Sequence, residues 1–343
     1  MRIIIDAMGG DNAPDAIVKG AVMAKRGLGA EIVLVGKKEE IRRCLDAEGE
    51  QDIQVVDARE VVTMDDDPSF ATRRKKDSSM SVALRMLRDG EGDAMVSAGS
   101  TGVLLTGATL TVKRVRGIRR AALAPVLPNG RRGTVLIDCG ANVECTAEYL
   151  LQFAFMGSLY ARKILGCYNP RVGLLNNGTE THKGGELQKQ AFALLKKAGD
   201  EGRINFVGNV EASQTLTGDV DVLVTDGFSG NILLKTCEGV AKFIIDGLKN
   251  VFASSAKNKL AAMIVRQDVT ALKKILDVNQ VGGTALLGIT KPVIKAHGSS
   301  REEAIFSAIR QAIEFCHADV ITEIESNIEY MRLPVTAASG AEE

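Results

Sequence analysis

Apolar positions along the chain alternate between short continuous runs and amphipathic stretches. The runs at residues 2–6, 31–36 and 53–57 predict buried strands, and the stretches between them, at about 14–26 and 39–45, predict helices. Strands that alternate with helices are typical of a parallel sheet whose two faces are covered by helices. We therefore expect an α/β protein, a three-layer α/β/α sandwich with a mostly parallel sheet.

The same alternation continues along the chain. Further strands are expected at 94–96, 133–138, 172–175, 204–207, 222–225 and near 292–297, with helices up to residue 87 and at 147–165 and 301–330. Residues 244–276 place apolar side chains at helical spacing among basic ones, which predicts an amphipathic helical segment. A length of 343 residues permits one or two domains. We expect a single catalytic unit at 1–333 and a loose polar tail at 334–343.

Most of the predicted strands end in glycine and small polar residues. Ser97-Ala-Gly-Ser-Thr-Gly102 follows one strand and opens a helix, and residues 224–234 repeat this arrangement. Free amides at the start of a helix, with the helix dipole behind them, form a ready anion site. One such turn is weak evidence, because it also occurs without a ligand. Two copies favour a phosphate site.

Ligands of open α/β sheets bind at the carboxyl ends of the strands, so we expect a pocket there. The expected binding residues are Asp6, Gly9, Gly10, Gly99, Ser100, Thr101, Gly102, Asn142, Glu180, Asp226, Ser229, Gly230 and His297. Lys183 and Asn231 are the polar groups that we expect to act in catalysis.

Composition and motifs narrow the functional classes. Lys plus Arg and Asp plus Glu both number 43, and aromatic residues are 4% with no Trp, which argues against nucleic acid as a partner. The six cysteines lack Cys-x-x-Cys spacing and a zinc-like cluster, so free thiols and no metal are expected. No dinucleotide, P-loop or hydrolase-elbow motif occurs, and we expect no cofactor.

The apolar run at the N-terminus lies between Arg2 and Asp6, so it meets a charge too early for the apolar region of a signal peptide. This predicts a cytoplasmic protein. Residues 94–112 carry no charge, but they are too rich in Ser, Thr and Gly for a good membrane span.

The roles of the basic clusters and of the amphipathic segment each have alternative interpretations. The run Arg73, Arg74, Lys75 and Lys76 is either a solvated surface or a docking site for an acidic partner, and residues 113–120 hold a second basic group. The segment at 244–276 either packs on the core or on a second copy, or touches anionic lipid.

A series of motifs, in order from residue 1 to about 330, resembles the PlsX family of bacterial phosphate acyltransferases. They are Asp6-Ala-Met-Gly-Gly-Asp11, Arg73-Arg-Lys-Lys76, Ser97-Ala-Gly-Ser-Thr-Gly102, Asp138-Cys-Gly-Ala-Asn142, Asn177-Gly-Thr-Glu180, Thr225-Asp-Gly-Phe-Ser-Gly-Asn231 and Lys295-Ala-His-Gly-Ser299. Asn12 departs from this family, which often has His there, so we assign it no proton transfer.

The resemblance implies transfer of a fatty acyl group from acyl carrier protein to inorganic phosphate, giving acyl phosphate for phospholipid synthesis. It also implies a fold related to phosphotransacetylases and isocitrate dehydrogenase-like proteins, and a homodimer. A membrane glycerol-3-phosphate acyltransferase would accept the product, with peripheral contact at the inner face of the cell membrane. Phosphate is already a nucleophile, so the protein needs only to position the reactants and stabilise an oxyanion. The alternatives are an acyl-CoA phosphotransacetylase, a dehydrogenase and a non-catalytic scaffold.

Overall fold

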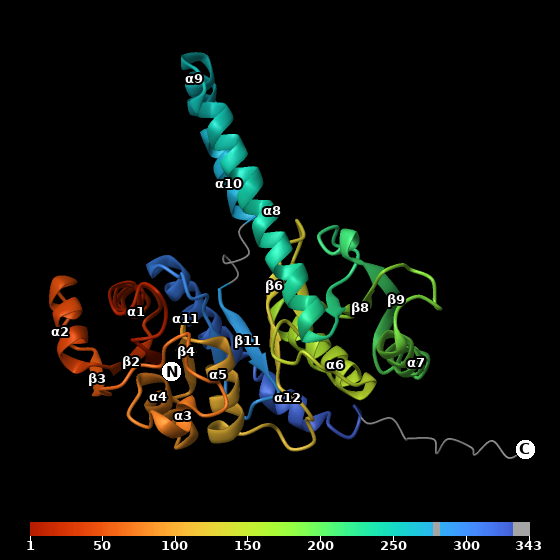
Figure 1. Ribbon diagram of the computed structural model, residues 1–343, viewed down its shortest axis with the longest axis horizontal. Helices are drawn as coiled ribbons and strands as arrows, with labels where there is room; N and C mark the ends of the chain where they lie inside the picture. Colours follow the sequence, from red (N-terminus) through yellow and green to blue (C-terminus); the bar gives the residue numbers. More distant parts are fainter. Residues whose placement is uncertain (277–281, 332–343) are drawn as a thin grey trace, which may run out of the picture.

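The structure, a computed structural model, describes residues 1–276 and 282–331. The predicted tail at 334–343 lies outside the described residues. Figure 1 shows a body built from two sheets and their helices, from which a long helical arm projects.

The first sheet has seven strands and is mostly parallel, with β11 antiparallel to both of its neighbours. In order of pairing, its strands are β3 (Gln54–Asp57), β2 (Glu31–Gly36), β1 (Arg2–Asp6), β4 (Ala94–Ser97), β12 (Val293–Lys295), β11 (Thr284–Leu287) and β5 (Ala122–Ala124).

The second sheet has five strands, which are parallel except at the β6–β7 pair. In order of pairing they are β6 (Val126–Leu127), β7 (Thr134–Ile137), β10 (Val222–Val224), β8 (Arg171–Asn176) and β9 (Asn205–Glu211). Only Pro125 separates β5 in the first sheet from β6 in the second. Proline cannot donate a ladder hydrogen bond, so pairing passes from one sheet to the other at this residue.

Helices cover both faces of each sheet, which confirms the expected α/β/α class. On β1, Ile3 and Ile5 point toward one hydrophobic cluster and Ile4 toward the other, as the period of a strand requires. The first cluster includes α1 (Asp15–Leu28), α2 (Lys38–Ala47), α6 (Ala147–Ile164), α7 (Glu186–Asp200) and α11 (Glu302–His317). The second includes α4 (Ser79–Arg88), α5 (Thr101–Gly107) and the start of α8 (Gly227–Ala253).

The sequence did not predict several short elements. The strands β5, β6 and β11 were not expected, and α5 continues as a π-helix at Ala108–Val112. Two further short elements lie in connecting segments: the helix α3 (Ala71–Arg74) between β3 and α4, and the 3-10 turn Ala212–Gln214 between β9 and β10. The single helix expected at 301–330 is wrong: it divides into α11 and α12 (Val320–Ser326), because Asp319 adopts a left-handed conformation with φ 50°.

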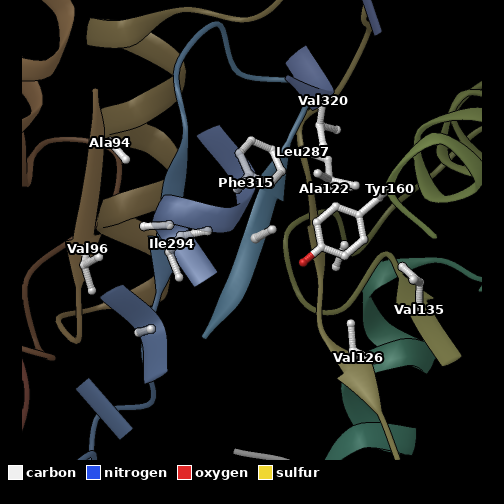
Figure 2. Close-up of a cluster of buried hydrophobic side chains, with 14 of the residues drawn as sticks. Ala94, Val96, Ala122, Val126, Val135, Tyr160, Leu287, Ile294, Phe315 and Val320 are labelled. Atoms are coloured by element: carbon white, nitrogen blue, oxygen red, sulfur yellow. The ribbon is translucent and has the colours of Figure 1, made fainter. Parts of the chain in front are cut away.

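One hydrophobic cluster runs through both sheets (Figure 2). Tyr160 of α6 lies against Phe315 of α11, with ring centroids 5.9 Å apart, and its hydroxyl accepts a hydrogen bond from Gln311. Leu287 of the first sheet and Val135 of the second belong to the same cluster. This shared core supports the prediction of one unit at 1–333, which stays a prediction.

The arm consists of α8, α9 (Ala256–Ile264) and α10 (Arg266–Leu276), and after α9 at its tip the chain turns back toward the body in α10 (Figure 1). Near its tip Leu260, Met263 and Ile264 are 57%, 68% and 77% exposed. The alternative in which this segment packs on the core is therefore wrong for its tip. Among the described residues, no helix is long and apolar enough to cross a membrane.

Candidate active site

A pocket of about 240 Å³ lies where the carboxyl ends of strands from both sheets meet the first turns of α8. Its polar lining residues come from four elements or their ends, and are Thr101, Asn231, Lys235, Glu238, Thr284, Lys295 and His297. Its apolar wall consists of Leu123, Pro125, Val126 and Leu234. We call the surface formed by the polar residues the charged part of the pocket, and the surface formed by the apolar residues its apolar part.

Two buried charged groups lie beneath the charged part. Lys295, at the end of β12, is 8% exposed, and its ammonium donates to the carbonyls of Ala98 (3.5 Å) and Ala296. Burial lowers the pKa of Lys295 to about 8, although the nearby Asp6 carboxylate favours the charged form. Burial also raises the pKa of Asp6, against hydrogen bonds from the Ser79 and Ser97 hydroxyls.

Close backbone contacts bring the ends of β1, β4 and β12 together. A Cβ at Gly9 would lie 2.7 Å from both the Gly99 amide nitrogen and the Asp6 carboxylate. Gly10 has φ +100° and lies close to the Gly298 carbonyl, to which the Asp11 amide donates at 2.8 Å. These glycines therefore serve close packing of the strand ends.

A polar group from α8 lies over the charged part of the pocket. Lys235 Nζ is 3.3 Å from His297 Nε2 and 2.8 Å from the Glu238 carboxylate. The other ring nitrogen of His297 is 2.8 Å from the Ser299 hydroxyl. Burial, followed by the charge of Lys235, lowers the pKa of His297. His297 is therefore neutral near pH 7, and Lys235 and Lys295 supply the positive charge.

The start of α8 is fixed against the end of β7. Asp226 caps the helix by accepting hydrogen bonds from the Ser229 amide (2.8 Å) and hydroxyl (2.9 Å). A Cβ at Gly230 would lie 2.0 Å from the Asp138 carbonyl, so only glycine fits there. Asp226, Ser229 and Gly230 thus position the helix, and the Ser229 amide is already bonded to the cap.

Asp138 organises the loop after β7. Its carboxylate is fully buried and accepts from the amides of Leu123 (2.8 Å), Cys139 (2.7 Å) and Asn142 (2.6 Å) and from the Asn142 side chain (3.0 Å). Burial nevertheless raises the pKa of Asp138 to about 6. Asn142 therefore serves this loop, because its amide group also donates to the Ala121 carbonyl.

Cys139 lines the pocket but is a poor nucleophile. Burial raises the pKa of its thiol to about 12, and the Asp138 charge adds to this effect. The thiolate that attack requires is therefore scarce near neutral pH.

Asn231 and Lys183 occupy different places. Asn231 lines the pocket from the first turns of α8, and a Cβ at Gly140 would lie 3.7 Å from its side chain. Lys183 lies in the loop after β8, over Gly178, with its ammonium 4.0 Å from the half-exposed Glu180 carboxylate. Lys183 and Glu180 are not among the residues that line the pocket.

The turn before α5 has the predicted form. Ser100 is the N-cap residue and is buried, and the Gly99 amide donates to the Ser97 hydroxyl at 3.1 Å. Thr101 lines the pocket, whereas Gly102 packs against Pro68. The amino end of α5 therefore borders the pocket at Thr101.

The four residues of the basic run at 73–76 have different surroundings. Lys75 donates to the Asp66 carboxylate (2.6 Å) and the Val61 carbonyl (2.9 Å), so it holds a loop in place. Arg74 lies over the Phe70 ring, and Arg73 and Lys76 are exposed.

The chain has close relatives among known proteins. Residues 1–323 match the family described as "Fatty acid synthesis protein". A phosphate acyltransferase of Bacillus cereus (strain ATCC 14579) is 48% identical over 331 residues, or 96% of this chain and 98% of the relative. One from Bacillus thuringiensis (strain Al Hakam) is equally similar over the same shares. The chain belongs to the phosphate acyltransferase family.

Solved structures confirm the fold. A phosphotransacetylase from Streptococcus pyogenes has a TM-score of 0.61 at 19% identity, with 94% of each chain covered. A branched-chain phosphotransacylase from Enterococcus faecalis has a TM-score of 0.57 at 16% identity, covering 92% of this chain and 99% of its own.

Sequence reasoning missed two pocket groups, Lys235 and Lys295, and also the role of Asp138 in organising the loop after β7. Lys235 follows Asn231 by four residues, so helical periodicity places both on one face of α8. Asn12 also has a role that the sequence did not indicate, because its side-chain amide donates to the carbonyls of Ser299 (3.1 Å) and Ser300 (3.2 Å).

Proposed function

We propose that this protein moves a fatty acyl group from acyl carrier protein to inorganic phosphate and forms acyl phosphate for phospholipid synthesis. Its family makes it a transferase. The observation that carries the proposal is the lining of the pocket, which combines two lysines with four apolar residues. An anionic nucleophile and an apolar acyl donor need these two surroundings side by side.

Phosphate occupies the charged part, between Lys235 and Lys295 and beside the amino end of α5. One of its oxygens attacks the thioester carbonyl carbon, so that a C–O bond forms and the carbonyl oxygen becomes an oxyanion. Collapse of this intermediate breaks the C–S bond, and the electron pair leaves with sulfur as a thiolate that takes a proton from solvent. Positioning and charge stabilisation account for the catalysis.

Asn231 donates its side-chain amide to the oxyanion, because it lines the pocket on the same helix face as Lys235, one turn away. Lys183, in the loop after β8, which pairs with β10, neutralises charge that develops during the reaction. The acyl chain lies along Leu123, Val126 and Leu234, whose apolar side chains line the other part of the pocket.

A second groove of about 350 Å³ supports a place for the carrier protein. It borders Asn142 and Ala141, next to Gly140 of the pocket, and contains Arg114, Arg120, and the exposed Leu110 and Val143. An acidic carrier fits this basic rim by charge. The Arg73–Lys76 run is the alternative site, but Lys75 already has an acidic partner.

The arm supports two further parts of the proposal. Its tip places the exposed Leu260, Met263 and Ile264 near Lys257 and Lys259, which suits weak, reversible contact with an anionic bilayer. Such contact would occur at the inner face of the cell membrane, where a glycerol-3-phosphate acyltransferase accepts the product.

The stem of α8 exposes Val240, Phe243 and Val251, which are 52%, 79% and 58% accessible. These side chains suit packing against a second copy in a homodimer.

The deciding experiment incubates the protein with acyl-carrier-protein thioester and inorganic phosphate and traps acyl phosphate with hydroxylamine. Phosphate-dependent hydroxamate formation is expected, with acyl-CoA as a poorer donor. Preference for acyl-CoA would instead make the protein a phosphotransacetylase. Thioester loss that does not depend on phosphate would refute the proposal.

A further inference from the structure

Another cleft, of about 260 Å³, lies at the amino ends of strands β7, β8 and β10 of the second sheet, away from the pocket and from the groove beside α5. This arginine cleft is defined by Arg131, Arg132, Arg171, Tyr168, Cys167 and Asp221. Arg131 and Arg132 precede β7, whose four residues end next to Asp138. At about 3.3 Å per residue, the strand separates the cleft from the pocket by about 13 Å.

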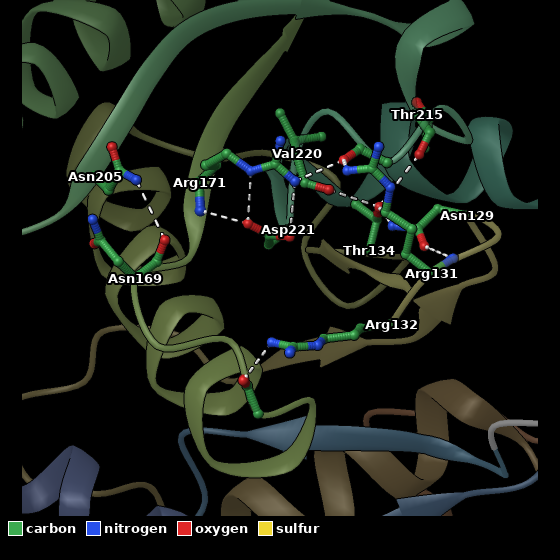
Figure 3. Close-up of polar contacts among 12 residues, drawn as sticks. Asn129, Arg131, Arg132, Thr134, Asn169, Arg171, Asn205, Thr215, Val220 and Asp221 are labelled. Carbon is green, nitrogen blue, oxygen red and sulfur yellow. Dashed lines mark hydrogen bonds and ion pairs between the residues drawn. The ribbon is translucent and has the colours of Figure 1, made fainter.

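Positive charge in the arginine cleft is only partly balanced (Figure 3). Arg171 forms a two-pronged ion pair with Asp221, at 3.0 and 3.1 Å, so these charges compensate each other. Arg132 donates to the Gly166 carbonyl at 2.6 Å, and Arg131 lies 3.4 Å from the Gly218 carbonyl. Within residues 1–276 and 282–331, neither Arg131 nor Arg132 forms an ion pair. Among the residues that line the cleft, two positive charges therefore remain.

The arginines are also held in place before any ligand arrives. The Asn129 side-chain oxygen accepts from the amides of Arg131 and Gly133, both at 2.9 Å, and its amide donates to the buried Thr134 hydroxyl at 3.0 Å. This fixes the turn that carries Arg131 and Arg132. Each guanidinium has five N–H donors, so one bond to a carbonyl leaves several free. Prior ordering lowers the entropic cost of binding.

We propose that the arginine cleft binds a nucleoside diphosphate. Guanidinium groups match the geometry of phosphate oxygens, and two unbalanced charges suit two linked phosphate groups. Tyr168 lines the same cleft with 94% of its surface exposed, which leaves its ring free to stack on a base. The cleft lies at the opposite end of β7 from the pocket, so its ligand is not the phosphate of the proposed reaction.

The test titrates ADP into the full-length protein by calorimetry at low salt. We expect one ADP per chain, with affinity that falls steeply as salt rises. Arg131→Gln with Arg132→Gln should weaken binding at least tenfold, whereas Arg43→Gln, an exposed arginine on α2, should not. Tyr168→Ala should weaken ADP binding and leave inorganic diphosphate binding unchanged.

Lys295→Met separates the two sites, because it removes a cation of the pocket and leaves the arginine cleft intact. ADP binding that persists in this variant supports the proposal. ADP binding that disappears in it places the nucleotide in the pocket and overturns the proposal. Absence of binding at millimolar ADP, or binding that is indifferent to the Arg131 and Arg132 substitutions, would also overturn it.

Discussion

At the scale of single residues, Asn231 and Lys183 are the side chains proposed to stabilise the negative charge that develops in the reaction. Asn231→Ala and Lys183→Ala should each lower kcat by about 10²-fold or more, as loss of an oxyanion donor does. Steady-state kinetics with acyl-carrier-protein thioester measures this. Asn250→Ala on α8 and Lys189→Ala on α7 are exposed controls that should keep normal turnover. If both test variants are folded and turn over near the normal rate, neither residue belongs to the mechanism.

Lys295 gives the pocket a characteristic pH dependence. Because burial lowers its pKa to about 8, the ammonium loses its proton as pH rises through that value instead of near 10.5. We expect kcat/KM for phosphate to decline above about pH 8. Lys295→Met should lower kcat/KM and remove this decline. A decline that survives in Lys295→Met must come from another group.

Much of the site could be predicted from residue types at strand ends. Which of these residues line the pocket and which only hold the local structure could not be predicted. Asp6, Thr101, Asn231 and His297 follow predicted strands and do gather near the pocket. Asp226 and Ser229 are hydrogen-bonded to each other and do not line the pocket. The first amides of a helix lack partners within the helix, and here the Asp226 side chain supplies one. Lys235 was missed because it lies beyond the strand end, about two turns into α8.

At the scale of elements, long periodic segments were predictable and short strands were not. The strands β5 and β6 have three and two residues around Pro125, which is too short for a period to show. The arm was predicted as amphipathic, but its projection depends on tertiary packing that no local pattern records.

The groove beside α5 makes a prediction about the carrier. Arg114→Glu with Arg120→Glu should raise KM for the carrier-protein thioester at least tenfold and flatten its salt dependence. KM for a small thioester with the same acyl group should not change. The matched pair Arg73→Glu with Arg74→Glu tests the other basic cluster. An effect confined to that second pair would move docking to α3.

The arm tip makes a prediction about lipid. Leu260→Glu with Met263→Glu should abolish flotation with anionic vesicles, because burial of apolar side chains supplies the binding. The same variant should remain active in solution and should keep the proposed dimer. Phe243→Glu on the stem is the matched control, and it should instead weaken the dimer in light-scattering measurements. If the tip variant still floats, the anchor lies elsewhere.

At the scale of the whole molecule, the shared core predicts one cooperative unit. Phe315→Ala removes a buried ring of α11 that contacts Tyr160 of α6, and it should cost about 3–5 kcal/mol of unfolding free energy. In urea, hydrogen exchange of peptides from β1 and from β8 should report the same midpoint, shifted together by the substitution. Separate midpoints would divide the chain into two domains.

The helix α8 also sets a spacing. It begins at the pocket and has 27 residues, which at about 1.5 Å per residue makes a rod about 40 Å long. A protein anchored by the far end of this rod works well outside the Debye length of about 8 Å at physiological salt. In the proposed complex with an anionic bilayer, the arm would act as a spacer, so that the pocket recruits phosphate and the proposed acidic carrier without opposition from the negative surface.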